Sequence, residues 1–152
     1  MNNLNSHDFP VDWVLLNKLC VGRAPRTKSH IEKLKKQGIK SILSLCSEDE
    51  IKPPDQIEDH FICKRKVLPD HKYNREITVN EINESLEIVK EILNYGPVYI
   101  HCVASVERSP LICMAWLKKE CNLSTQQALD YLMEIHPGTN PLPSHLRALN
   151  QL

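Results

Sequence analysis

The sequence has no excess of charge of either sign and no long apolar segment. Its 19 basic and 19 acidic residues cancel, so no overall field would draw the protein to nucleic acid or to an anionic membrane. No stretch approaches the roughly 20 apolar residues that a transmembrane helix needs. The N-terminus, MNNLNSHDFP, lacks the cationic and then apolar order of a secretion signal. We therefore expect a cytoplasmic protein with neither a nucleic-acid nor a membrane partner.

The sequence also lacks the cysteine spacings of a disulfide framework or a zinc site. Six cysteines are scattered along the chain without a C-x-x-C pair, which favours reduced thiols. Internal repeats, low-complexity tracts and Gly/Ser linkers are absent too. A chain of 152 residues that is 41% hydrophobic can bury one core, so we predict a single domain over residues 1–152. The oligomeric state stays open, with a monomer as the default.

Apolar periodicity and turn signals predict strands that alternate with helices. Capping patterns at Ser29, Thr78 and Ser124 should each open a helix. Ser109 and Pro110 supply a cap and a first-turn proline for a further helix. The predicted strands cover residues 13–16, 19–22, 39–45, 61–68 and 97–101, with a charged surface loop at 48–59. This order indicates an α/β fold, in which helices flank a central, mostly parallel, twisted sheet of about four to five strands.

The segment from Val98 to Pro110, which joins a predicted strand to a helix, carries the clearest chemical signal. In such a turn, backbone N–H groups can converge on an oxyanion, and the helix N-terminus adds its positive dipole end. The same donors would stabilise a thiolate at Cys102, the candidate nucleophile, with His101 helping to fix the loop. Arg108 can present a planar fork to two phosphate oxygens. The other candidate phosphate-binding positions lie between them: Val103, Ala104, Ser105, Val106 and Glu107.

This loop resembles the H-C-x5-R-S/T signature of the protein tyrosine phosphatase superfamily. Within this superfamily the sequence is most similar to the dual-specificity branch, both in the loop that contains Pro69 and Asp70 and in the order of its elements. Most of residues 11–150 can be aligned with the catalytic domain of that branch. The resemblance implies a reaction that needs no metal and no cofactor. In it, Cys102 takes the phosphoryl group while Asp70 protonates the leaving oxygen and later activates water. Ser109, close to the sulfur, would favour departure of the thiolate.

Two residues of the loop depart from the family pattern, and a further cysteine matches one of its branches. Ser105 stands where the family usually has glycine, which adopts φ > 0 without steric cost. Glu107 adds a negative charge that would oppose a phosphate dianion unless it points away. In the phosphoinositide phosphatase branch, a cysteine at the end of the strand matching 39–45 can pair with the nucleophile. That likeness implies a reversible Cys46–Cys102 disulfide.

The sequence leaves more than one function open. The leading hypothesis is a phosphoprotein phosphatase for phosphotyrosine, with phosphoserine and phosphothreonine as further candidates; its partner would be a phosphorylated protein or a small phosphomonoester. Lipid, nucleotide, sugar or glucan phosphates stay open because selectivity lies in the surrounding loops. A phosphate-binding pseudophosphatase with weak turnover is a second hypothesis, motivated by Ser105 and Glu107. A rhodanese-type sulfurtransferase is a third, which leaves Asp70 and Ser109 without a purpose.

Overall fold

A mostly parallel sheet forms the centre of the protein, which this computed structural model describes over residues 8–152. Over these residues five strands pair in the order β1-β2-β5-β3-β4. They are β1 (Asp12–Leu15), β2 (Leu19–Gly22), β3 (Ser41–Ser44), β4 (Ile62–Arg65) and β5 (Val98–His101). β1 is antiparallel to β2, and all other neighbours are parallel. The predicted α/β fold is confirmed.

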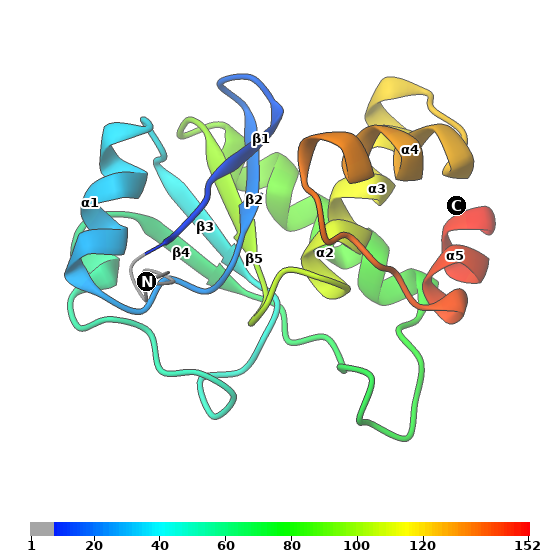
Figure 1. Ribbon diagram of the computed structural model, residues 1–152, viewed down its shortest axis with the longest axis horizontal. Coiled ribbons are helices and arrows are strands. Elements are labelled where there is room, and N and C mark those ends of the chain that lie inside the picture. The colour runs from blue at the N-terminus through cyan, green and yellow to red at the C-terminus, as the bar shows by residue number, and fades with distance from the viewer. Residues whose placement is uncertain (1–7) are drawn as a thin grey trace, which may run out of the picture.

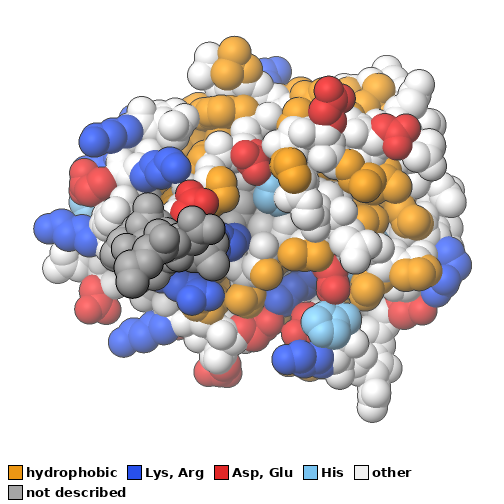
Figure 2. Space-filling view, viewed as in Figure 1, with side chains coloured by type: hydrophobic (Ala, Val, Ile, Leu, Met, Phe, Trp, Pro, Cys, Tyr) orange, Lys and Arg blue, Asp and Glu red, His pale blue; other side chains and the backbone are white. Residues whose placement is uncertain are grey.

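Helices cover both faces of this sheet (Figure 1). They are α1 (Lys28–Lys36), α2 (Val79–Leu93), α3 (Arg108–Cys121), α4 (Thr125–Ile135) and α5 (Pro143–Asn150), with a short 3-10 helix, η1 (Ile57–Asp59). α1 lies against one face, and α2 to α5 gather on the other. Successive side chains of a strand point to opposite faces. In β5, Tyr99 therefore packs in the apolar cluster beneath α1, while Val98 and Ile100 pack in the larger cluster beneath α2 and α3. Figure 2 shows cationic and anionic side chains interspersed over one face of the molecule.

Several predicted boundaries were wrong. α1 begins two residues earlier than expected, because Thr27 and not Ser29 accepts the capping hydrogen bond, from the N–H of His30 at 3.2 Å. α3 begins at Arg108, and its N-cap position, Glu107, makes no capping bond. Ser109 therefore lies inside the first turn of α3 and is not its cap. The capping boxes that open α2 and α4 are both present as predicted.

The predicted strands 39–45 and 61–68 were too long. Regular pairing between β3 and β4 stops at Ser44 and Arg65, although single backbone bonds continue from Lys66 and Leu68 to β3 and the residue after it. The chain then leaves the sheet and turns towards Asp70. The apolar residues beyond the strand, such as Leu68, are buried in the core without being part of a ladder, so hydrophobic pattern alone could not mark the end of the strand.

This topology gathers several loops at one edge of the sheet. The four parallel strands β2, β5, β3 and β4 all end there, and α3 begins there after the loop that follows β5. In open α/β sheets this carboxyl edge is the usual place for a binding site. The loops after β3, β4 and β5, although distant in sequence, are therefore positioned to share one site.

Candidate active site

A cleft of about 540 Å³ opens at this edge of the sheet. Three loops line it: the loop after β3 contributes Glu50, the loop after β4 contributes residues 70–72, and the loop from β5 to α3 forms the rest. The structure therefore brings together Cys102, Arg108 and Asp70, which the sequence predicted as one site. Of the predicted phosphate-binding positions between Cys102 and Arg108, all except Ser105 line the cleft.

Cys102 is the first residue after β5, at the start of the loop that leads to α3. Its side chain is buried, with 3% of the residue exposed, and its Sγ lies 3.3 Å from Oγ of Ser109. A hydroxyl at this distance can donate a hydrogen bond to the sulfur, and the positive end of the α3 dipole adds to the stabilisation of a negative charge there. The arrangement suits a nucleophilic thiolate.

His101 fixes the backbone of the loop at Cys102, the candidate nucleophile. Burial lowers the pKa of His101 to about 4, so its ring is neutral near pH 7. Nδ1 lies 2.8 Å from the carbonyl oxygen of Cys102 and must donate to it, because a carbonyl only accepts. Nε2 then accepts from the hydroxyl of Ser44 in β3, at 2.7 Å. A buried two-bond link therefore ties the Cys102 peptide to the neighbouring strand.

Arg108 is held by groups from two other loops. Its Nη2 lies 2.7 Å and its Nη1 3.2 Å from the carboxylate oxygens of Glu50, and Nη1 also donates to the carbonyls of Leu45 and Leu68. Burial alone would lower the pKa of Arg108, but the bonds to Glu50 outweigh it and raise the pKa. Partial burial opposes ionisation of Glu50, yet the bonds from Arg108 lower the pKa of its carboxyl. The guanidinium is thus charged and fixed in orientation at the wall of the cleft.

Asp70 and Glu107 stand at the mouth of the cleft. Asp70 is half-buried, and its Oδ1 accepts a hydrogen bond from the backbone N–H of Lys72 at 2.8 Å, which sets the direction of its carboxyl group. Glu107 also lines the cleft, and its Oε2 lies 3.3 Å from Nδ1 of His71. The Glu107 carboxylate therefore remains on the rim, where it pairs with a neighbour of the candidate acid.

Ser105 takes a left-handed backbone conformation, which glycine adopts without steric cost. Its φ is 60°, in the left-handed region, and only 2% of the residue is exposed. The side chain is directed away from the cleft, and its Oγ lies 2.8 Å from Oγ of Ser109 and 3.0 Å from Nε2 of His136. The hydroxyl thus has two polar partners in the interior, which offsets part of the cost of the left-handed backbone.

Cys46 is a buried free thiol beyond the end of β3. Burial, the largest influence, raises its pKa above the ordinary value. None of the six cysteines, all of which lie within residues 8–152, forms a disulfide. The proposed pairing of Cys46 with Cys102 stays a prediction. Over the same residues, no three His, Cys, Asp or Glu side chains are grouped to hold a metal ion, and no helix is long and apolar enough to cross a membrane.

Two residues that contact the site were missed by the sequence analysis. Glu50 lies in the segment 48–59, which was assigned as a charged surface loop. His136 lies at the C-terminal end of α4. A buried arginine calls for an acidic partner, but no local pattern singles out Glu50 among its acidic neighbours. His136 gave no local signal either, since its contacts are with residues far away in the sequence.

Comparisons with known proteins define the class to which the fold and the site belong. The family model "Dual specificity phosphatase, catalytic domain" matches residues 20–152. The chain belongs to this family, which confirms the resemblance found in the loop. Among relatives, dual specificity protein phosphatase 9 of Homo sapiens is 28% identical over 134 residues, and dual specificity protein phosphatase 1-A of Xenopus laevis is 26% identical over 99 residues.

These relatives are longer than the present chain. The matches span 88% of this chain and 33% of the human protein, and 64% of this chain and 26% of the Xenopus protein. Among solved structures, PTPMT1 in complex with PI(5)P superposes with a TM-score of 0.81 and covers 93% of this chain and 92% of that one. Its sequence identity is 17%, so this likeness shows the shared fold.

Proposed function

We propose that this chain is a phosphoprotein phosphatase, acting on phosphotyrosine and also on phosphoserine or phosphothreonine, through a phosphocysteine intermediate on Cys102. The observation that carries the proposal is the meeting of Cys102, Arg108 and Asp70 in one cleft. The loop from Cys102 to Arg108 is the phosphate-binding P-loop. Membership of the dual specificity phosphatase family supports the same reaction.

In the first step the sulfur of Cys102 attacks phosphorus. The S–P bond forms as the bond from phosphorus to the leaving oxygen breaks, and Asp70 gives its proton to that oxygen. Backbone N–H groups at the start of α3 and the guanidinium of Arg108 hold the three non-transferring oxygens, where negative charge is spread in the transition state. Because Glu50 already fixes the guanidinium, little reorganisation is needed when the phosphate arrives.

In the second step water hydrolyses the phosphocysteine. The Asp70 carboxylate accepts a proton from the water as its oxygen bonds to phosphorus, and the S–P bond breaks. The electron pair returns to the sulfur of Cys102, where the hydroxyl of Ser109, 3.3 Å away, donates a hydrogen bond to the thiolate that leaves. Inorganic phosphate and the free enzyme result.

The surroundings of the cleft support a protein substrate. His71 and Lys72 follow the candidate acid on the same loop and line the cleft mouth, where they can meet the carbonyls and acidic groups of a phosphopeptide. The formal net charge of zero supports an enzyme without a nucleic-acid or membrane partner, and the scattered cysteines, typical of reduced thiols, support a cytoplasmic location.

A panel of phosphate monoesters tests the proposal. The purified chain would be assayed for phosphate release from phosphotyrosine, phosphoserine and phosphothreonine peptides, a phosphoinositide, a nucleotide and a sugar phosphate, alongside Cys102→Ser. We expect release from the phosphotyrosine peptide by the wild type only, with Cys102→Ser still binding that peptide. Fastest release from a non-protein phosphate would reassign the substrate. Binding without release by the wild type would indicate a pseudophosphatase.

A further inference from the structure

A continuous chain of polar contacts runs behind the P-loop from β1 to the sulfur of Cys102. Oδ2 of Asp12 lies 2.6 Å from Nδ1 of His136, whose Nε2 lies 2.7 Å from the carbonyl oxygen and 3.0 Å from Oγ of Ser105. The hydroxyls of Ser105 and Ser109 are 2.8 Å apart, and that of Ser109 is 3.3 Å from Sγ of Cys102. Every link is within hydrogen-bonding distance. Of these contacts, only the one between Ser109 and Cys102 takes part in the proposed reaction.

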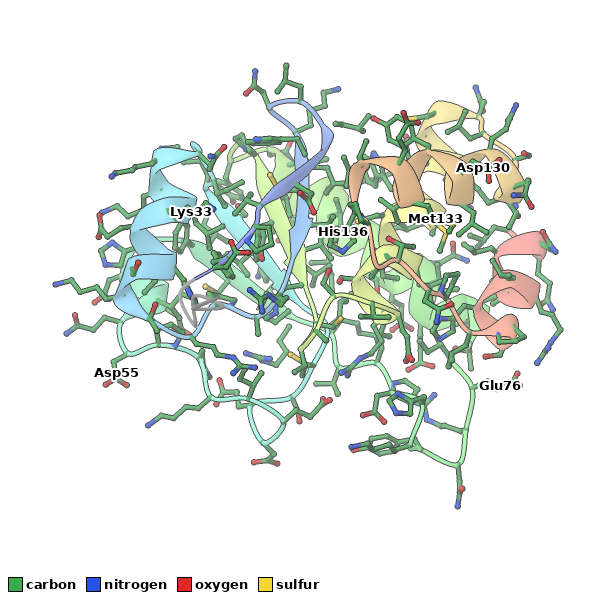
Figure 3. All side chains as sticks on the ribbon, viewed as in Figure 1. Lys33, Asp55, Glu76, Asp130, Met133 and His136 are labelled. Atoms are coloured by element: carbon green, nitrogen blue, oxygen red, sulfur yellow. The ribbon has the colours of Figure 1, made fainter. Side chains whose placement is uncertain are left out.

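His136, the second member of this chain of contacts, connects two distant parts of the fold. Figure 3 places His136 at the end of α4 beside the sheet. A cavity of about 270 Å³ borders the contact and is lined by Asp12, Ser105 and His136 among others. The side chain of His136 is 8% exposed and that of Asp12 is 26% exposed. The Asp12–His136 pair thus reaches solvent through the Asp12 end.

The geometry sets the direction of every hydrogen bond in the chain. The carbonyl of Ser105 can only accept, so Nε2 of His136 carries a proton. The hydroxyl of Ser105 then accepts from that nitrogen and directs its own proton to Ser109. Ser109 in turn directs its proton to the sulfur of Cys102. The thiolate of Cys102 leads to the same directions, because a thiolate can only accept a hydrogen bond. Ser109 must then donate to the sulfur, and Ser105 must donate to Ser109.

The carboxylate of Asp12 completes this order. Its Oδ2 lies 2.6 Å from Nδ1 of His136, so the ring is held at both of its nitrogens, by Asp12 on one side and by Ser105 on the other. The N–H donor at Nε2 polarises the two hydroxyls in the direction of the sulfur, since hydrogen bonds in a chain strengthen one another in a buried site. The negative charge of Asp12 holds this ring in place.

We propose that Ser105 and His136 are positioning residues for Cys102, which fix the Ser109 hydroxyl as a one-way donor to the sulfur. The family's usual glycine at position 105 could not provide this link, because it has no side chain. The serine is therefore a working part of the loop and not a sign of lost activity. The catalytic consequence rests on the proposed phosphatase function, but the effect on the sulfur does not.

Ser105→Gly is the sharpest test, because glycine retains the left-handed backbone and removes only the hydroxyl. The readout is alkylation of Cys102 by iodoacetamide over a range of pH, followed by peptide mass spectrometry so that the other cysteines do not interfere. We expect the pH of half-maximal reactivity to rise by about half a unit to one unit, the effect of weakening one hydrogen bond to the charged sulfur. Ser41→Ala is the matched control, because this buried serine donates to Ile92, outside the site, and it should leave the profile unchanged.

His136 provides an independent arm should Ser105→Gly fail to fold. His136→Ala should raise the alkylation midpoint as Ser105→Gly does, whereas His136→Gln, whose amide can still donate to Ser105, should stay nearer the wild type. A merely structural role predicts equal effects of Ala and Gln. Equal midpoints in these two variants, or an unchanged midpoint in a folded Ser105→Gly, would overturn the proposal.

Phosphatase kinetics separate the two proposals from each other. If the enzyme turns over as proposed, Ser105→Gly should lower kcat more than kcat/KM, because departure of the thiolate belongs to the second step. A wild type that releases no phosphate, but whose alkylation midpoint still depends on Ser105, would refute the phosphatase function and leave the positioning role standing. Normal hydrolysis by the wild type, with an unchanged alkylation midpoint in Ser105→Gly, would support the phosphatase function and refute the positioning role.

Discussion

Glu50 holds Arg108 through two hydrogen bonds, at 2.7 and 3.2 Å, across 58 positions of sequence. The arginine is 5% exposed, so the carboxylate supplies the charge that a buried guanidinium needs. The same pair sets the plane of the guanidinium before any phosphate binds. The Glu50–Arg108 pair therefore both stabilises the fold and orients the guanidinium in the site.

Replacing Glu50 should destabilise the protein in a way that phosphate can reverse. We expect Glu50→Ala to lower the free energy of unfolding by about 1 to 3 kcal/mol, because the buried guanidinium loses its charged partner. Added phosphate should stabilise this variant more than the wild type, since the anion replaces the lost carboxylate. Urea denaturation with and without phosphate measures both effects. Glu81→Ala is the control, because Glu81 pairs with Arg75 away from the cleft and its loss should not be reversed by phosphate. Wild-type stability in Glu50→Ala would contradict this account.

Asp70→Asn tests the assignment of the general acid. Its turnover should fall by roughly 10²-fold or more while substrate binding changes little, because the amide cannot give a proton to the leaving oxygen. The defect should grow as the leaving group becomes a poorer one, in a series of aryl phosphates and then an alkyl phosphate. A rate with the poorest leaving group that equals the wild-type rate would mean that another residue is the acid.

The buried His101 should make the protein less stable in mild acid. Its pKa is about 4 in the folded protein against an ordinary value of 6.5, so the unfolded chain takes up a proton first. Stability from this group is present above pH 6.5 and is lost as pH falls towards 4, by up to about 2 to 3 kcal/mol. Burial lowers the pKa of His145 to about 4 as well, so the wild type carries two such groups.

Denaturation curves between pH 6.5 and 5 isolate these histidines from the acidic residues, whose ionisation matters at lower pH. His101→Asn should be less stable than the wild type at neutral pH but should lose less stability on acidification. His145→Asn should flatten the same window in a similar way, and the double variant should flatten it further. An unchanged slope in His101→Asn would show that the ring is not held neutral in the folded protein.

The sequence predicted those parts of the site that are contiguous or follow a familiar spacing. Cys102, Arg108 and Ser109 lie within one loop and its adjoining turn, so their relative positions follow from local backbone structure. Asp70 was found through the resemblance of its loop to the Asp loop of the dual-specificity branch. The alternation of strands and helices likewise required a mostly parallel sheet.

What the sequence could not predict depends on contacts between distant segments. His136 contacts Asp12, which is 124 positions away in the sequence. No local sequence pattern around either residue predicts this contact. The role of Ser109 as a helix cap was inferred from a preference for serine at caps, but the helix starts earlier and the hydroxyl faces the sulfur. At Ser109 the tertiary contacts of the hydroxyl, and not the preference of serine for helix caps, determine its place in the structure.

The predicted pairing of Cys46 with Cys102 can be tested with peroxide. Oxidation of Cys102 to a sulfenic acid would let the Cys46 thiol attack it, with loss of water, to form a disulfide. We expect peptide mapping after brief treatment to find a Cys46–Cys102 linkage, and dithiothreitol to restore activity. In Cys46→Ser, the same treatment should cause irreversible loss of activity. Absence of that linkage in the treated wild type would remove the hypothesis.

The most direct test of the account is detection of the covalent intermediate. Asp70→Asn would be mixed with an aryl phosphate that has a good leaving group and quenched in acid within milliseconds, because loss of the base should slow hydrolysis of the intermediate. We predict one phosphoryl group on the peptide that contains Cys102, and none there in the Cys102→Ser, Asp70→Asn double variant. Release of the phenol without a phosphoryl group on Cys102, or the group on another residue, would contradict the central claim.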